Sequence, residues 1–145
     1  MAALTISRTN ADALVGLAEA SVAAAKLAKG QGDQAAAAAH INAAVGHYGG
    51  ALQRPHLLGD ASERADVRYN AACAAALAGQ HVTAQQLLTS LAAAGSLSAA
   101  DVATDEDLAS LRGRQWFGDL VRGLQARSCD DEAQPRSSMH CNPQQ

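Results

Sequence analysis

Histidine is the side chain of this 145-residue sequence whose chemistry would most readily serve a metal or catalytic site. His40 and His47 are seven residues apart, about two helical turns. Two histidines that ligate one metal ion from a straight helix need the i,i+4 spacing instead. His56 and His81 have no partner near them in the sequence. We therefore expect these histidines to be solvated or packed and to form no metal site.

The C-terminal residues bring together another set of metal-ligand types: Cys129, the acidic run 130–132, His140 and Cys141. Thiolates and carboxylates together can bind a metal ion, but the tail has neither a Cys-x-x-Cys nor a His-x3-His spacing. Its abundant Ser, Asp, Gln and Pro and its few apolar residues favour disorder. We predict a disordered polar tail over residues 127–145. A metal- or redox-responsive tail stays an alternative hypothesis.

Enzyme signatures are missing from the sequence. The glycine pair at Gly30 and Gly32 opens a predicted helix, but it follows a helix rather than a strand and lacks the Lys-Ser/Thr step of a phosphate loop. The acidic run 105–107 is explained by the preference of carboxylates for a helix N-terminus. Cys73 lies inside a predicted helix, where a free cysteine acts as a small hydrophobic residue. We predict that the chain is not an enzyme and uses no cofactor and no metal ion.

Composition indicates the fold class. About a quarter of the residues are alanine, and aromatic residues make up 3%. Since alanine is the strongest helix former and a poor strand former, an all-α fold is expected, and the length suits one domain. A net charge of -3 disfavours a nucleic-acid partner. The odd number of cysteines, three, does not suit a disulfide framework and favours a reducing compartment.

The N-terminal residues bear on localisation. Residues 1–30 are rich in Ala and carry Arg8, as in organellar transit peptides, whereas Asp12 and Glu19 count against that interpretation because such peptides are poor in acids. No run of 18 apolar residues predicts a membrane span. We predict a cytoplasmic protein. The alternative is an organellar one, in a plastid or mitochondrion, if residues 1–30 act as a transit peptide.

Caps, glycines and the three-to-four spacing of apolar residues divide the chain into helices. Gly30 is expected to be the left-handed C-cap of the first helix, and Asp33 caps the second. Asp60 and Glu63 have the spacing of a capping box. The predicted helices cover about 10–29, 34–52, 60–79 and 82–95, then a short turn after 98, a helix through 108–111, and a last helix at 114–125.

One of these segments resembles a tetratricopeptide repeat. It reads Tyr-Asn-Ala-Ala-Cys-Ala-Ala-Ala-Leu-Ala-Gly over residues 69–79, followed by Ala84 and a Leu-Leu pair at 87–88. In the family pattern Ala72 and Ala84 would be the small residues where the two helices of a repeat cross, and Gly79 would be the turn glycine.

The residues on either side extend the resemblance to about 10–125. Ala44, Tyr48 and Pro55 resemble the end of another repeat, and 105–120 resembles a closing helical segment. The turn glycines lie too far ahead of Ala44 for a 34-residue unit, so this first repeat would be longer or irregular. The resemblance implies antiparallel helix pairs of a short α-solenoid with a C-terminal capping helix over 10–126, preceded by an N-terminal arm at 1–9. A small non-repeat helical bundle is the alternative fold.

In this family the first helix of each repeat lines a concave groove. The resemblance therefore implies that Asp66, Tyr69, Asn70, Cys73 and Leu77 contact a partner. Asn70 matches an asparagine that grips the backbone of a bound peptide, although it could equally bond a neighbouring helix. Asp66 stands where one subclass has a lysine that clamps a ligand's carboxylate, which counts against that ligand.

We expect a protein–protein interaction module, acting as an adaptor, assembly factor or scaffold that binds a partner's peptide or helix in the groove. The alternative is a small structural subunit embedded permanently in a large assembly, without a ligand groove. Two repeats bury little core, and such arrays usually need three or more repeats. We therefore hypothesise that a partner, or self-association through the alanine-rich faces, stabilises the chain.

Overall fold

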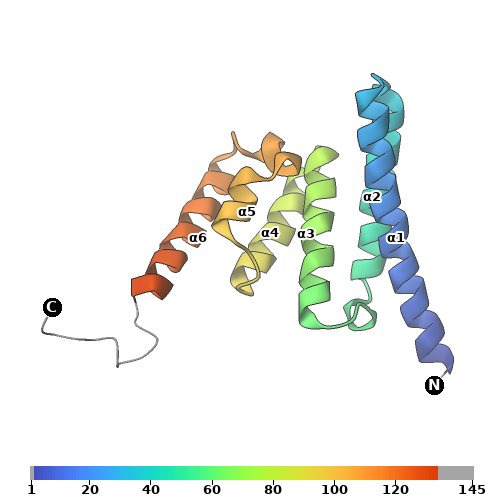
Figure 1. Ribbon diagram of the computed structural model, residues 1–145, viewed down its shortest axis with the longest axis horizontal. Helices are drawn as coiled ribbons and strands as arrows, with labels where there is room; N and C mark the ends of the chain where they lie inside the picture. Colours follow the sequence, from blue (N-terminus) through green and yellow to red (C-terminus); the bar gives the residue numbers. More distant parts are fainter. Residues whose placement is uncertain (1, 134–145) are drawn as a thin grey trace, which may run out of the picture.

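The computed structural model describes the backbone of residues 2–133 and the side chains of residues 10–130. Within these residues the chain is all-helical, as predicted, and has no strand (Figure 1). No helix in this part of the chain is both long and apolar enough to cross a membrane. The α-helices and 3-10 helices (η) are α1 (Ala2–Gly30), α2 (Gln34–Leu52), η1 (Pro55–Leu57), α3 (Ala61–Leu77), α4 (His81–Ala93), α5 (Ala99–Thr104), η2 (Glu106–Leu111) and α6 (Gln115–Ala133).

Helices that follow one another in the sequence pack against one another. The long hairpin of α1 and α2 forms one end of the molecule in Figure 1, and α6 forms the other. Between them α3 packs on α2 and on α4, while α6 contacts α4 and α5. The short helix η2 lies against α3, so the segment that links α4 to α6 returns to the middle of the molecule.

The helix boundaries follow from caps that the sequence predicts. Asp33 accepts a hydrogen bond from the amide of Ala36 and begins α2. Asp60 and Glu63 form the predicted capping box at the start of α3. Gly79 and Gly95 follow α3 and α4 with φ of 75° and 72°, the left-handed conformation that suits glycine. After α1 that conformation falls on Gly32, with φ of 80°, so the prediction of Gly30 was wrong.

Both ends of the helical region extend further than predicted. Helix α1 begins at Ala2 and includes residues 2–9, which we expected to form a separate arm. Because alanine and leucine near the start favour helix, no cap is needed at Asn10. Helix α6 continues to Ala133, through the first part of the predicted tail, because no glycine or proline interrupts it after Gly123. The predicted disorder of residues 134–145 lies outside the described residues.

Helix α3 separates two hydrophobic cores and contributes to both. All residues from 71 to 76 are buried, so this stretch of α3 is enclosed around its full circumference. The N-terminal core comprises Ala11, Ala18, Ala25, Ile41, Ala44, Tyr48, Ala51, Leu57, Leu58, Val67, Ala71 and Ala74. The C-terminal core comprises Ala72, Cys73, Ala75, Ala76, Ala84, Leu88, Ala92, Val102, Leu108, Leu111, Phe117 and Leu124.

Small residues bring the first two helices close together. A Cβ atom added to Gly50 would lie 3.4 Å from the Leu14 Cδ1 atom, whereas Gly46 and Gly49 have no such neighbour within 4 Å. Helix α2 nevertheless continues through all three glycines to Leu52. Packing of the buried faces of α1 and α2 therefore outweighs the cost of glycine in a helix, which is about 1 kcal/mol per residue.

Candidate binding groove

The five residues predicted to contact a partner lie along α3 and line three hollows. Tyr69, Asn70 and Cys73 line a central hollow of about 240 Å³ between α3, α1 and η2. Asp66 lines an outer hollow of about 440 Å³ between α3 and the α4–α5 segment. Leu77 lines a third hollow of about 190 Å³, formed with α1 and α2. The structure thus places all five beside hollows, but they do not share one cavity.

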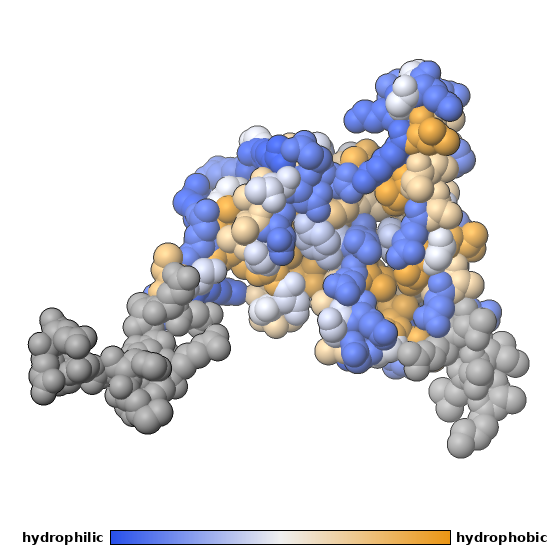
Figure 2. All heavy atoms as spheres, viewed as in Figure 1, coloured by the Kyte–Doolittle hydropathy of each residue, from blue (hydrophilic) through white to orange (hydrophobic). Residues whose placement is uncertain are grey.

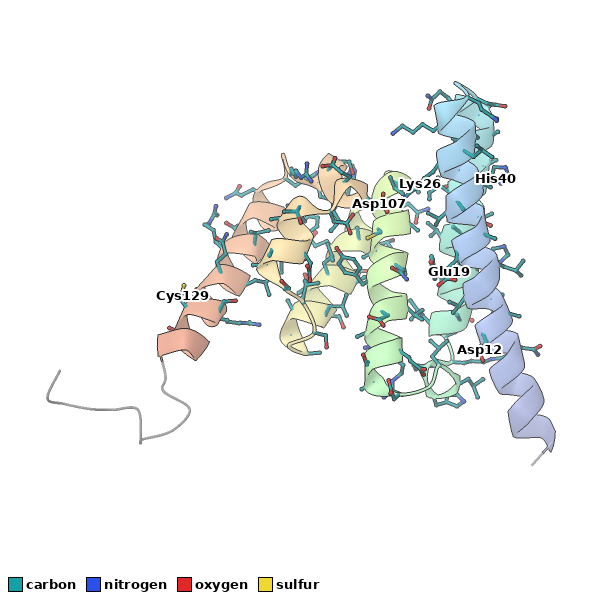
Figure 3. The ribbon with its side chains drawn as sticks, in the orientation of Figure 1. Asp12, Glu19, Lys26, His40, Asp107 and Cys129 are labelled. Carbon is teal, nitrogen blue, oxygen red and sulfur yellow. The ribbon has the colours of Figure 1, made fainter. Side chains whose placement is uncertain are left out.

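The central and outer hollows meet at Tyr69 and Asp105, which line both of them. We call these two hollows together the α3 groove. In Figure 3 the side chains of Glu19 and Lys26 on α1 lie toward α3, with Asp107 opposite them. Figure 2 shows hydrophilic side chains over the α5–η2 end of the molecule and hydrophobic ones among those of the N-terminal hairpin. The η2 side of the groove is therefore polar, and Val22, Tyr48 and Ala74 are apolar or aromatic members of the central hollow's lining.

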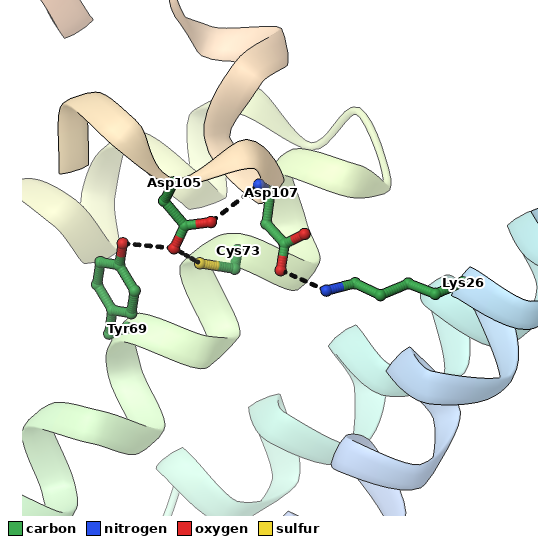
Figure 4. A network of polar contacts seen from close by, with 5 residues as sticks. All are labelled: Lys26, Tyr69, Cys73, Asp105 and Asp107. Carbon is green, nitrogen blue, oxygen red and sulfur yellow. Dashed lines mark hydrogen bonds and ion pairs between the residues drawn. The ribbon is translucent and has the colours of Figure 1, made fainter. Parts of the chain in front are cut away.

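Asp105 organises the centre of the groove (Figure 4). The Tyr69 hydroxyl donates a hydrogen bond to its Oδ2 atom at 2.7 Å, and the Cys73 thiol donates to the same oxygen at 3.7 Å. The other carboxylate oxygen, Oδ1, accepts the backbone amide of Asp107 at 2.9 Å and so begins η2. One carboxylate thus caps a short helix and fastens it to α3.

A second contact joins η2 to α1. The Lys26 Nζ atom lies 2.9 Å from the Asp107 Oδ2 atom, and the two residues are 81 positions apart in the sequence. The side chain of Lys26 is 55% exposed and that of Asp107 25% exposed. This pair crosses the central hollow and connects the N-terminal hairpin to the C-terminal half (Figure 4).

Burial and nearby negative charge raise the pKa values of three side chains that line the groove. Burial, followed by the nearby carboxylate of Asp105, raises the pKa of the Cys73 thiol to about 12. Burial, followed by the hydrogen bond to Asp105, raises the pKa of Tyr69. The pKa of Tyr48 rises to about 12, mainly through burial. At neutral pH Cys73 is therefore a thiol and a poor nucleophile, which agrees with the small hydrophobic role predicted for it.

One set of groove residues has metal-ligand chemistry. The Cys73 sulfur and the carboxylates of Asp105 and Asp107 offer ligand atoms within 4.8 Å of one another. However, Asp105 already accepts three hydrogen bonds and Asp107 is paired with Lys26. A metal ion would have to displace the Lys26 ammonium and deprotonate Cys73. The three ligand atoms are therefore already engaged by other groups of the chain.

Asp66, Asn70 and Leu77 are the exposed members of the predicted set, and Leu77 is 37% exposed. The Asn70 side chain forms no hydrogen bond with any other residue among 10–130, so within that range it does not tie α3 to a neighbouring helix. Its amide borders the central hollow, and neither its donor nor its acceptor is engaged by a residue of the range 10–130.

The other sequence candidates lie away from the groove. His40 and Cys129 are exposed on α2 and α6 and are not among the residues that line the groove. His56 is exposed, and His47 is half-buried on α2. His81 contacts the guanidinium of Arg114 and so connects the starts of α4 and α6. His140 and Cys141 lie outside the described residues.

Sequence reasoning missed the residues that complete the groove. The acidic run 105–107 was explained as a helix start, and Asp105 does cap η2. Its contacts with Tyr69 and Cys73, and the pair between Lys26 and Asp107, join segments distant in the sequence. An exposed lysine in an amphipathic helix carries no signal of such a partner.

A scan against models of protein families finds none that matches this chain. Searches of curated proteins and of solved structures return no match either.

Proposed function

We propose that this chain is a protein–protein interaction module that binds a peptide or helix of a partner protein in the α3 groove, as an adaptor, assembly factor or scaffold. The observation that carries the proposal is the meeting of two hollows at Tyr69, beside an Asn70 amide with no partner in residues 10–130. An aromatic ring and a free amide can bind the side chains and the backbone of a partner together.

The tetratricopeptide-like architecture is part of the same proposal. Support comes from the packing of α1 to α4 in chain order, from the left-handed Gly79 between α3 and α4, and from the complete burial of Ala72 and Ala84. In such an arrangement α3 would be the groove-lining helix of its repeat. The free thiols of Cys73 and Cys129 suit the reducing conditions of the cytoplasm.

Affinity capture from cell extract tests the function. The wild type is compared with Asn70→Ala and with Asn42→Ala, which removes an exposed amide from α2 outside the groove. We expect a partner that both the wild type and Asn42→Ala retain and that Asn70→Ala recovers at least about tenfold less well, as for a central interface contact. Quantitative mass spectrometry of the captured proteins gives the ratio. Capture of no specific protein by the wild type would contradict the proposal.

A structural subunit is the second candidate, and the exposed side of α1 favours it. Leu17 and Leu27 are 52% and 65% exposed, and Ala20 lies between them at helical spacing. Such an apolar face at the end of a helical array commonly packs against another protein. A partner captured equally by wild type and Asn70→Ala, and lost on Leu27→Gln, would favour this candidate.

A further inference from the structure

The α3 groove is acidic. Five carboxylates line its two hollows, from Glu19, Asp66, Asp101, Asp105 and Asp107. The single cationic side chain in that lining is Lys26, which is already paired with Asp107. A hollow lined by charges of one sign concentrates the opposite charge and speeds its association. The groove therefore attracts cations.

Most of this negative charge is uncompensated. Among residues 10–130, neither Asp66, Asp101 nor Glu19 takes part in an ion pair. Asp105 accepts its hydrogen bonds from a hydroxyl, a thiol and an amide, none of which carries a positive charge. The outer hollow thus brings three carboxylates, Asp66, Asp101 and Asp105, to one cavity without a cation from this part of the chain.

The chain itself shows that an ammonium group fits this groove. The Lys26 side chain extends from α1 across the central hollow and places its Nζ atom on Asp107 (Figure 4). Because Lys26 is more than half exposed, its ion pair is weak and exchanges readily. A lysine or arginine of another chain can therefore occupy the neighbouring carboxylates, and can compete for Asp107.

Apolar groups beside the carboxylates suit the stem of a basic side chain. The ring of Tyr69 and the side chain of Leu97 line the outer hollow together with Asp66 and Asp101. Lysine and arginine pack their methylene stems on apolar surface while the charged head contacts a carboxylate. The cavity of about 440 Å³ has room for such a side chain.

We propose that the occupant of the α3 groove is a basic protein segment, with one lysine or arginine in the outer hollow against Asp66 and Asp101 and a second near Asp107. This inference rests on the proposed function and specifies the chemistry of the partner. Tyr69 and Leu97 hold the stem of the first basic residue, and Asn70 bonds the backbone of the segment between the two.

The test uses a fluorescein-labelled peptide of alternating lysine and alanine, with an alternating glutamate–alanine peptide as its counterpart. Fluorescence anisotropy with the full chain measures the Kd at about 50 mM salt, where the Debye length is about 14 Å and ionic attraction is strong. We expect Asp66→Asn combined with Asp101→Asn to raise the Kd of the lysine peptide about tenfold. Lys26→Met should lower it several-fold, because a competing cation is removed.

The matched control removes two carboxylates elsewhere. Asp119→Asn combined with Asp130→Asn changes the net charge equally, on exposed positions of α6. We expect this variant to change the Kd less than twofold, and helical circular dichroism to stay the same in all variants. An equal loss in both double variants, or no binding of the lysine peptide to the wild type, would overturn the inference.

The outcome separates this inference from the proposed function. Capture can find a partner whose binding depends on Asn70 but is insensitive to the loss of Asp66 and Asp101. In that case the proposed function is supported, and the inference that the partner segment is basic is wrong. If the lysine peptide binds selectively but extract capture fails, the acidic groove stands and the proposed function is contradicted.

Discussion

Seven of the twelve residues in the core between α1, α2 and α3 are alanine, against five of the twelve in the core between α3, α4, η2 and α6, which also holds more of the fully buried large side chains. The largest fully buried side chains are Leu88, Leu91, Leu108, Leu111, Val102 and Tyr48, of which only Tyr48 belongs to the N-terminal core. An alanine side chain removes little apolar area from water, about one methyl group. The N-terminal hairpin therefore depends on the length and close approach of α1 and α2.

The two cores are also connected differently to the groove. The N-terminal core holds α1 against α2, and α1 contributes Glu19 and Lys26. The C-terminal core holds η2 on α3 and so fixes Asp105 and Asp107. The carboxylates of Asp105 and Asp107 are therefore held by the core that contains more fully buried large side chains, whereas Lys26 comes from the half whose core is richer in alanine.

Leucine-to-alanine substitutions in the two cores should have the largest effects on the free energy of unfolding. Leu108→Ala in the C-terminal core should lower the free energy of unfolding by about 4 kcal/mol, because Leu108 is fully buried. Leu57→Ala in the N-terminal core should cost about 2 kcal/mol, since Leu57 lies on a short 3-10 helix and is 6% exposed, whereas Leu108 is fully buried. Urea unfolding followed by far-UV circular dichroism gives both values. Equal losses would contradict the difference between the cores.

Alkaline pH should lower the free energy of unfolding by less than the leucine substitutions do. The pKa of Cys73 is about 12 in the folded protein, above its ordinary value of 9.0. Between pH 9 and pH 12 the thiol therefore ionises in the unfolded chain but stays protonated in the folded protein. The contribution of this thiol to the free energy of unfolding is complete below pH 9 and is lost as the pH rises toward 12. The slope is at most about 1.4 kcal/mol per pH unit for each such group. Thermal melts from pH 7 to 11 measure the fall in Tm.

Cys73→Ala is the control for that titration. Without the thiol, the Tm should fall less steeply between pH 9 and 10. The remaining fall above pH 10 reports the two tyrosines, because burial raises the pKa of Tyr48 to about 12 and also raises the pKa of Tyr69. A wild-type Tm that stays constant from pH 8 to 11 would show that these groups ionise as easily in the folded protein as in the unfolded chain.

The ion pair between the halves should have the smallest effect on stability. Lys26→Ala should lower the free energy of unfolding by less than about 1 kcal/mol, because the lysine is more than half exposed. The difference should shrink in 0.5 M salt, as screening weakens exposed pairs. Arg122→Ala, which breaks the exposed pair with Asp119 inside α6, serves as the local comparison. A loss above 2 kcal/mol for Lys26→Ala would show that the pair is a main connection between the halves.

Local chemistry in the sequence predicted most of the fold. The Asp33 cap and the Asp60–Glu63 box give the starts of α2 and α3, and Gly79 and Gly95 give the ends of α3 and α4. These signals act over a few residues, so they can be recognised without the tertiary structure. The predicted start of α1 and the predicted end of α6 were wrong, because neither segment contains a glycine or proline that would stop the helix there.

The candidate groove could be predicted only on the side of α3. Tyr69, Asn70 and Cys73 share one face of a helix, so their grouping follows from helical spacing. The opposite wall comes from η2 and α1. The contacts of Asp105 with α3 join residues 32 and 36 positions apart, and the contact between α1 and η2 joins residues 81 positions apart. Such contacts depend on how the helices pack, and nothing in the local sequence of Lys26 or Asp105 specifies them.

The placement of the aromatic residues gives the groove its own optical label. The chain has two tyrosines and one tryptophan, and both tyrosines, Tyr48 and Tyr69, line the central hollow. Trp116 lies on α6, edge-on to Phe117, beside the C-terminal core. Ultraviolet difference spectra of tyrosine therefore report occupancy of the groove, while tryptophan emission reports the opposite end of the fold. Binding and unfolding can thus be followed separately in one unmodified sample.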